Sequence, residues 1–249
     1  MPKDISPDLL VADSDPAWAT RGKALTDRLH ELLAPLALHV EHIGSTSVPG
    51  MAAKPVFDVQ VSVRDLQEAQ GAFDGPLAGQ GFELAPYRQD HVPAGSDDDP
   101  ARWTKRLWVR RGHQEPDVNL HVRVAGSPNE RLALLFRDWL RAHPEAVPAY
   151  ARFKQVLAGA VPDLATYADV KDPVVDLVVA VAEPWARETG WRPSTTMAAG
   201  RAPAGSDLGA PALGVPVDPR RPAVPLHGWS GPPPYEAVQA THCATALVA

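Results

Sequence analysis

The sequence has one cysteine, Cys243, and no excess of positive charge: 24 Lys and Arg stand against 30 Asp and Glu among 249 residues. A single cysteine excludes a disulfide within the chain and a zinc site made of several cysteines. The net charge of −6 argues against a protein that binds nucleic acid mainly by charge. No run approaches the roughly 18 consecutive apolar residues of a membrane-spanning helix, and residues 1–10 lack the apolar segment of a signal peptide. We therefore expect a cytoplasmic protein that does not enter a membrane.

Proline, by contrast, is abundant: the chain has 27, about twice the usual share of roughly 5%. Proline, glycine and alanine gather towards the end of the chain, where no apolar period of 2 or 3.6 residues is visible. Such a segment buries too little apolar surface to offset the entropy lost on ordering. We predict a folded domain over residues 8–187 and a disordered tail over residues 188–249.

Hydrophobic periodicity places strands in the first half of the predicted domain and helices in the second. In residues 56–63 the alternation is clearest, with Asp58, Gln60 and Ser62 on one face and apolar residues on the other. Residues 86–102 contain SDDDP and predict an exposed loop. The order of elements favours an α+β fold in which helices flank a small mixed sheet. The expected strands are 36–43, 56–63, 107–110 and 118–124, and the expected helices are 16–33, 64–73, 129–143, 145–158 and 172–187.

Three chemistry-bearing features fall close together, at the end of one predicted strand and the start of the next. Gly44 permits a tight turn, and the hydroxyls of Ser45 and Thr46 follow it. Asp58 lies on the next strand and can hold a Mg²⁺ ion that bridges phosphate oxygens, while Lys54 can add a positive charge. This pattern predicts a phosphate-binding turn. The alternative is a tight turn followed by a strand with an exposed aspartate.

The segment EHIGSTSVPGMAAKPVFDVQVSV, residues 41–63, closely resembles the signature of the GrpB family. The block FRDWLRAHPEAVPAYARFKQVLA, residues 136–158, is similar to that family's second signature, and NLHV, residues 119–122, to a third short motif. The resemblance implies a nucleotidyltransferase-like fold. Similar domains occur alone or fused to dephospho-coenzyme A kinase, which suggests by analogy a link to coenzyme A metabolism.

Mapped onto this chain, the resemblance assigns phosphate binding to Gly44 and Ser45 and the first metal-binding acid to Asp58. The second acid of the superfamily pattern is absent, because position 60 is glutamine. A third acid is expected on an adjacent strand, where Asn119 and His121 stand instead. Amide oxygens are weaker ligands for a hard cation, and imidazole favours transition metals. We expect at most one weakly held Mg²⁺, at Asp58, rather than a two-metal centre.

Further polar residues extend the candidate site. His42 precedes the turn and His121 can face Asp58, and either is a candidate acid or base or a hydrogen-bonded residue of the sheet. Arg137 and Arg141 lie four apart on one helix, where they can reach a phosphate or form a solvated face with an ion pair. We place Asn119, Arg137 and Arg141 at the rim of the substrate site, and the resemblance extends this rim with Tyr150, Lys154 and Lys171.

Two functions are compatible with these residues. The first is a domain that binds a nucleotide or other phosphorylated small molecule and transfers a nucleotidyl or phosphoryl group with one metal, using Asp58 and His121. The second is a non-catalytic module that binds a ligand or a protein and has lost the metal-binding acids.

Overall fold

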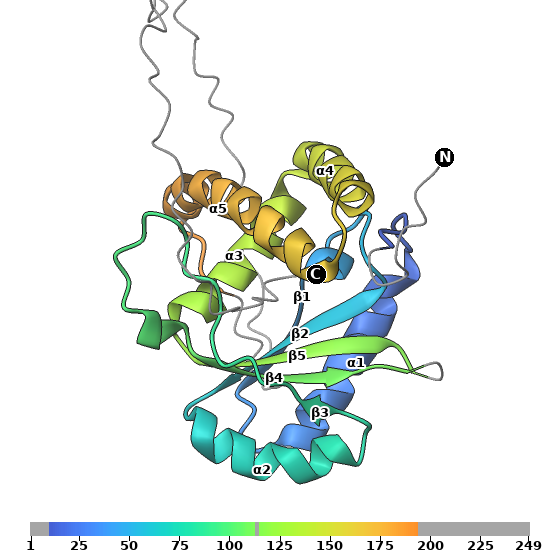
Figure 1. Ribbon diagram of the computed structural model, residues 1–249. Coiled ribbons are helices and arrows are strands. Elements are labelled where there is room, and N and C mark those ends of the chain that lie inside the picture. Colours follow the sequence, from blue (N-terminus) through green and yellow to red (C-terminus); the bar gives the residue numbers. More distant parts are fainter. Residues whose placement is uncertain (1–9, 113–114, 194–249) are drawn as a thin grey trace, which may run out of the picture. The chain divides into compact units, whose positions relative to one another are not determined.

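The computed structural model describes residues 10–112 and 115–193, and the predicted tail lies outside the described residues except for its first few positions. Five strands form one mixed sheet in the order β1-β2-β5-β4-β3, in which β2 and β5 run parallel and the other neighbours antiparallel (Figure 1). The α+β fold with a small mixed sheet flanked by helices is confirmed. No helix within the described ranges is long and apolar enough to cross a membrane.

The elements are β1 (His39–Ile43), β2 (Val56–Val63), β3 (Glu83–Leu84), β4 (Lys105–Arg110), β5 (Asp117–Val124), α1 (Ala17–Leu33), α2 (Leu66–Ala78), α3 (Pro128–Ala142), α4 (Val147–Ala160) and α5 (Leu164–Thr189), with 3₁₀ turns η2 (Ser45–Ser47), η3 (Pro100–Trp103) and η4 (Pro144–Ala146).

The sheet has one apolar face, which packs on α1 and α2. The alternation predicted for β2 is confirmed, because its apolar residues join the main core and its polar residues do not. Burial of a large apolar side chain stabilises a fold by about 1.5–3 kcal/mol, so this layer supplies much of the folding energy. The core residues of this layer include Phe57, Val59, Val61, Val63, Leu25, Leu29, Phe73 and Val118.

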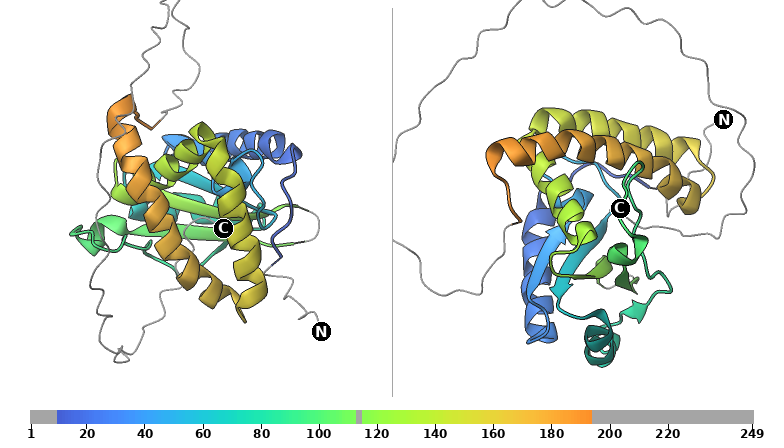
Figure 2. Two further views of the ribbon diagram at one scale, coloured as in Figure 1. Left: turned by 90° about the horizontal axis from the view of Figure 1, so that it is seen from above. Right: turned by 90° about the vertical axis from the view of Figure 1, so that its left-hand side faces the viewer.

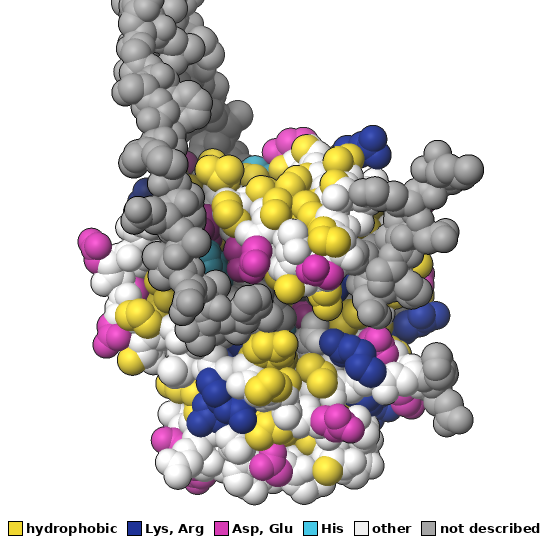
Figure 3. All heavy atoms as spheres, viewed as in Figure 1, with side chains coloured by type: hydrophobic (Ala, Val, Ile, Leu, Met, Phe, Trp, Pro, Cys, Tyr) yellow, Lys and Arg dark blue, Asp and Glu magenta, His cyan; other side chains and the backbone are white. Residues whose placement is uncertain are grey.

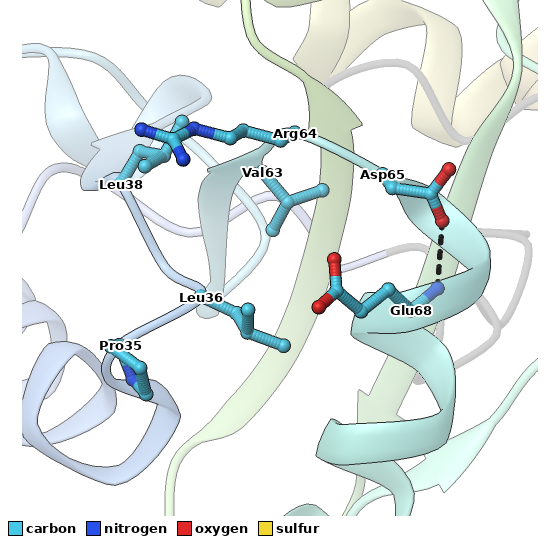
Figure 4. A pocket seen from close by; sticks show the side chains of 7 residues that line it. All are labelled: Pro35, Leu36, Leu38, Val63, Arg64, Asp65 and Glu68. Carbon is cyan, nitrogen blue, oxygen red and sulfur yellow. Dashed lines mark hydrogen bonds between the residues drawn. The ribbon is translucent and has the colours of Figure 1, made fainter.

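Helix α2 begins at Leu66 because Asp65 caps its first turn. The Asp65 carboxylate accepts hydrogen bonds from the backbone N–H groups of Gln67, at 2.8 Å, and Glu68, at 2.7 Å (Figure 4). A cavity of about 180 Å³ lies beside this cap and includes Val63, the last residue of β2. Because Asp58 stands near the other end of β2, this cavity is remote from the predicted site. The helix also continues through Gly75 and Pro76 to Ala78, past the end predicted at residue 73.

The opposite face of the sheet is polar and nevertheless buried. The register pairs Asp58 with Asn119, Gln60 with His121 and Ser62 with Arg123, and all six side chains are at most 5% exposed. Figures 1 and 2 show α3, α4 and α5 grouped over this side of the sheet, with α4 and α5 crossing above it. Buried polar groups require hydrogen-bond partners. The side chains of this face therefore have to bond to one another, to neighbouring residues or to a ligand.

Asp90 provides several of the hydrogen bonds and ion pairs that this polar face requires. Its carboxylate lies 2.6 Å from Lys105 Nζ and 2.7 Å from Arg123 Nε, and Asn129 Nδ2 donates to it at 2.9 Å. Burial alone would raise the pKa of Asp90, but the adjacent Arg123 and Lys105 charges lower it well below the usual range. Asp90 belongs to the segment predicted as an exposed loop. That prediction was wrong here, because the loop places this side chain, 3% exposed, against the polar face of the sheet.

Helix α5 is longer than the sequence suggested. It begins at Leu164, where the Asp163 side chain accepts a hydrogen bond from Thr166 N at 2.8 Å, instead of near Pro173. It ends at Thr189, beyond the domain boundary predicted at residue 187, and Gly190 closes it with φ +67°. Trp191 then packs back on the helices.

The outer surface of α4 and α5 carries apolar side chains that face away from the sheet (Figure 3). The most exposed is Leu177, at 68%, followed by Val181, Val156, Leu164 and Val170. The inner surface of α5 is different in kind, since its buried residues include Tyr167, Lys171 and Asp172.

Candidate anion-binding site

The site is built around the bend that follows β1. Gly44 has φ +73°, a conformation that favours glycine, and the chain then makes one 3₁₀ turn in which Ser47 N donates to Gly44 O at 3.1 Å. Asp58 is the strand partner of Ile43, so its carboxylate comes directly against the bend. A Cβ atom at position 44 would overlap Asp58 Oδ2. Only glycine therefore allows this carboxylate and this bend to touch.

Replacing Gly44 with alanine is expected to lower the free energy of unfolding by about 2–5 kcal/mol, since positive φ and overlap with Asp58 both act. Gly126 is the matched control, because it has φ +78° and a Cβ added there would meet no atom within 4 Å. Gly126→Ala should lose only the conformational part, about 1–2 kcal/mol. Urea unfolding measures both. Equal losses for the two variants would contradict the contact between Gly44 and Asp58.

The Asp58 carboxylate is held ionised by its neighbours. Asn119 Nδ2 donates to Oδ1 at 2.8 Å, and His121 Nε2 lies 3.5 Å from the same oxygen. Burial alone would raise the pKa of Asp58, but contacts with His121 and Asn119 and the nearby Lys171 ammonium outweigh it and lower the pKa. The side chain is 0% exposed. Asp58 is thus a buried negative charge fixed in orientation.

His121 faces Asp58 as a neutral ring. Its Nδ1 lies 3.4 Å from Arg123 Nη2, and because a guanidinium only donates, Nδ1 has to accept and the proton resides on Nε2. Burial, reinforced by the nearby Arg123 and Lys105 charges, lowers the pKa of His121 to about 4. At neutral pH the ring therefore presents an uncharged Nε2–H to Asp58.

Two buried lysines from the helices complete the inner part of the site. Lys154 on α4 is 1% exposed, and its Nζ donates to Ser45 Oγ at 2.7 Å. Lys171 on α5 is 3% exposed, and burial lowers its pKa to about 8. Burial and the nearby Lys171 charge lower the pKa of Lys154 well below its usual value. Both lysines are therefore stabilised in their charged form when an anion lies beside them.

The two lysines share a spacing that the sequence contains twice. Tyr150 precedes Lys154 by four residues and Tyr167 precedes Lys171 by four, which places each pair on one helix face. Lys154 Nζ lies 5.2 Å from the Tyr150 ring centroid, and Lys171 Nζ lies 5.9 Å from the Tyr167 ring centroid. Lys54 Nζ is also 5.9 Å from the Tyr167 ring. This repeated Tyr-x-x-x-Lys spacing is the signal that could have marked Lys171 as part of the site.

Other predicted site residues lie on the outer side of the bend. His42 is the strand partner of Val59 and so belongs to the apolar face, where its ring is 5.4 Å from the Phe57 ring and its Nε2 is 2.9 Å from Thr46 Oγ1. Burial is the main cause that lowers the pKa of His42 to about 4. His42 and Thr46 thus bond to each other, while the charge of Asp58 also acts on His42.

Arg137 and Arg141 hold the outer side of the bend. Arg137 is 3% exposed, with Nη1 2.8 Å from Glu41 Oε2 and Nε 2.7 Å from Asp138 Oδ1. Arg141 donates twice to Ser47 O, at 2.9 and 3.1 Å. A cavity of about 300 Å³ adjoins both arginines, and its lining includes His42 and Ser47 but neither Asp58 nor Ser45. In the free protein both guanidinium groups stabilise the loop.

The donor set around Asp58 does not fit a pair of Mg²⁺ ions. Of the three positions where the resemblance places acids, only position 58 carries one. The described ranges contain no group of three or more His, Cys, Asp or Glu residues arranged to hold a metal ion. Gln60 is bonded elsewhere, since its Oε1 accepts from Arg123 Nη1 at 2.5 Å and its Nε2 donates to Glu130 O at 3.3 Å. With Lys154 and Lys171 nearby, the charge balance favours an anion over a divalent cation.

The fold and the site together define a small α+β domain with a buried turn between β1 and β2, beside two buried lysines from α4 and α5. The family model described as GrpB protein matches residues 8–180, and the chain belongs to the GrpB family. The crystal structure of conserved protein GrpB from Enterococcus faecalis has the same fold, with a TM-score of 0.57 and 28% sequence identity over 71% of this chain and 99% of that one.

Curated relatives carry two kinds of name. The chain is 35% identical over 202 residues to a protein named dephospho-CoA kinase from Mycobacterium leprae, covering 73% of this chain and 48% of the relative. It is 32% identical over 172 residues to UPF0157 protein BH1888 from Halalkalibacterium halodurans, covering 69% of this chain and 80% of the relative. The chain thus spans about half the length of the dephospho-CoA kinases that it matches.

Proposed function

We propose that this chain binds a phosphorylated small molecule, of the nucleotide class, with a phosphate group at the bend between Gly44 and Ser45. The observation that carries the proposal is the pair of buried lysines, Lys154 and Lys171, one of which donates to Ser45 at 2.7 Å. Burying an ammonium group is unfavourable unless an opposite charge compensates it. Asp58 acts on both lysines and Asp172 on Lys171, and a phosphate between the two ammonium groups would add to this negative charge.

Each group has a defined task in this proposal. Lys154 and Lys171 supply positive charge, and Lys54 adds to it from the loop, since its charge acts on both of them. Asp58 raises the pKa of both buried lysines and so helps to keep them protonated for the ligand. Ser45 supplies a hydroxyl at a bend that Gly44 makes possible. Asn119 and His121 hold the Asp58 carboxylate in place.

A non-catalytic module is the second candidate, and Gln60 favours it. This residue stands where a second metal-binding acid is expected and is bonded to Arg123 and Glu130. Transfer of a nucleotidyl or phosphoryl group would have only Asp58 to hold a cation. Incubation with labelled ATP and Mg²⁺ separates the two candidates: turnover that Asp58→Asn abolishes supports transfer, and binding without turnover supports the module.

Titration calorimetry with the full chain tests the binding site. The probes are inorganic pyrophosphate, ATP and dephospho-CoA, the last because relatives are named dephospho-CoA kinase. Ser45→Ala removes one hydroxyl and should weaken a bound probe about threefold to tenfold. Ser96, an exposed serine, is the control, and Ser96→Ala should change nothing. If no probe binds, or if both variants bind alike, the bend is not a phosphate site.

Binding is expected to weaken as the pH rises through about 8, the pKa of Lys171. Burial and Lys54 lower that pKa, and Asp172 and Asp58 raise it. In the free protein Lys171 is charged below about pH 8 and neutral above it, so the attraction for an anion is lost on the alkaline side.

A phosphate monoester, with a pKa of about 6, keeps its charge there. Calorimetry with ribose 5-phosphate should show up to about a tenfold loss of affinity per pH unit between pH 8 and 9.5. Constant affinity over this range contradicts the assignment.

A further inference from the structure

Two buried polar atoms beside the lysines lack hydrogen-bond partners among the described residues: Tyr150 Oη and Asp172 Oδ1. Both residues are 6% exposed. An unsatisfied buried polar group costs about 1–3 kcal/mol, so native proteins leave few without a partner, water or ligand. These two atoms are therefore expected to have an occupant.

The two side chains belong to the inner surface that also carries the lysines. Tyr150 lies one turn before Lys154 on α4, and Lys154 Nζ is 5.2 Å from its ring. Asp172 follows Lys171 on α5, and the next buried residue of that helix, Val175, packs in the same apolar cluster as Tyr150. The charge of Asp172 also acts on the Tyr150 hydroxyl. The other carboxylate oxygen, Asp172 Oδ2, faces away towards His91 Nδ1, at 3.9 Å.

The hydrogen-bonding chemistry of Tyr150 Oη and Asp172 Oδ1 restricts the kind of group that can bond to both atoms. A phenol hydroxyl donates one hydrogen bond, and a carboxylate oxygen accepts one. An alcohol does both tasks at once, because it accepts from the phenol and donates to the carboxylate. A cationic group would meet Lys154 and Lys171, which repel it, and an alkyl group would leave both atoms unsatisfied.

We infer that Tyr150 and Asp172 form a subsite for an alcohol group of the phosphorylated ligand, so that the site selects sugar or polyol phosphates over alkyl phosphates. The inference rests on the proposed function, since it assumes that the phosphate lies at the Gly44 bend. A nucleotide, through its ribose, belongs to the class that the subsite accepts.

Titration calorimetry at pH 7 with the full chain compares ribose 5-phosphate with butyl phosphate, which has a phosphate monoester and no alcohol group. Ribose 5-phosphate should bind about threefold to tenfold more tightly. Tyr150→Phe should remove most of that preference and leave pyrophosphate binding unchanged. Asp172→Asn should also remove most of the preference, and it should weaken pyrophosphate binding as well, because Asp172 raises the pKa of Lys171. Tyr87→Phe, at a tyrosine 37% exposed, and Asp169→Asn, at an exposed acid of the same helix, are the controls and should keep the preference.

The outcomes separate this inference from the proposed function. If pyrophosphate binds but ribose 5-phosphate shows no preference over butyl phosphate, the two atoms hold only water and the inference is overturned while the phosphate site stands. A preference that survives both Tyr150→Phe and Asp172→Asn also overturns it. If neither pyrophosphate nor either ester binds, the phosphate site fails and the inference fails with it. The comparison of the two esters uses the unaltered chain, so it remains decisive even where a variant does not fold.

Discussion

Lys154→Met is expected to weaken pyrophosphate binding about tenfold to a hundredfold while making the free protein more stable. The loss of affinity follows because a hydrogen bond from a charged donor contributes about 1.5–3 kcal/mol. The gain in stability, about 1 kcal/mol, follows because Lys154 is 1% exposed and methionine fills a similar volume without a buried charge. Calorimetry and urea unfolding measure the two effects.

Lys23 is the control for this substitution, because it is an exposed lysine that pairs with Asp27 at 2.7 Å on α1. Lys23→Met should leave both binding and stability within about 0.5 kcal/mol of the original chain. Opposite changes in affinity and stability are typical of a residue kept for binding at the expense of the fold. A Lys154→Met variant that loses stability and still binds pyrophosphate would show that the lysine is a structural residue.

Asp90→Asn is expected to lower the free energy of unfolding by about 3–5 kcal/mol. The substitution removes the carboxylate that forms ion pairs with both Lys105 and Arg123, and both cations are 0% exposed. Asparagine keeps the shape of the side chain, so the loss measures charge rather than packing. Urea unfolding followed by circular dichroism measures it.

Asp98 provides the comparison, since its ion pair with Arg102 at 2.9 Å lies at the surface, with side chains 31% and 59% exposed. Asp98→Asn should cost less than about 1 kcal/mol. A loss at Asp90 no larger than the loss at Asp98 would mean that the buried cations are compensated in another way. Because Arg123 also fixes the proton position of His121, Asp90→Asn should further loosen the support of Asp58.

The sequence was sufficient to predict four of the five strands and the closeness of the bend to Asp58, whereas the two-residue strand β3 was not predicted. Alternation in residues 56–63 placed Asp58 on the polar face, and the Gly-Ser turn is close to it because β1 and β2 pair in antiparallel register. Both features follow from the alternation of polar and apolar residues and from the pairing of strands that are neighbours in the sequence. A sequence pattern shows both directly. The orientation of His42 was not predictable in the same way, because β1 has only five residues and its alternation is weak.

The residues that reach the site from far along the chain were harder to predict. Asp90 comes from a loop rich in acids and prolines, and nothing local indicates that one acid of that loop is buried between Lys105 and Arg123. Lys171 was expected near the substrate from the resemblance alone, because the helix was predicted to begin after it, whereas the Asp163 cap begins α5 earlier and places Lys171 within the helix. Long-range burial, not local propensity, fixes both side chains.

A crystal structure of the full chain with bound pyrophosphate tests the central claim most directly. We predict a phosphate group within hydrogen-bond distance of Ser45 Oγ and Lys154 Nζ, with Lys171 on its other side and no change in the contact between Asp58 and Asn119. Pyrophosphate bound instead in the cavity beside Arg137 and Arg141, with the Ser45–Lys154 bond undisturbed, would contradict the claim and move the ligand to the outer side of the bend.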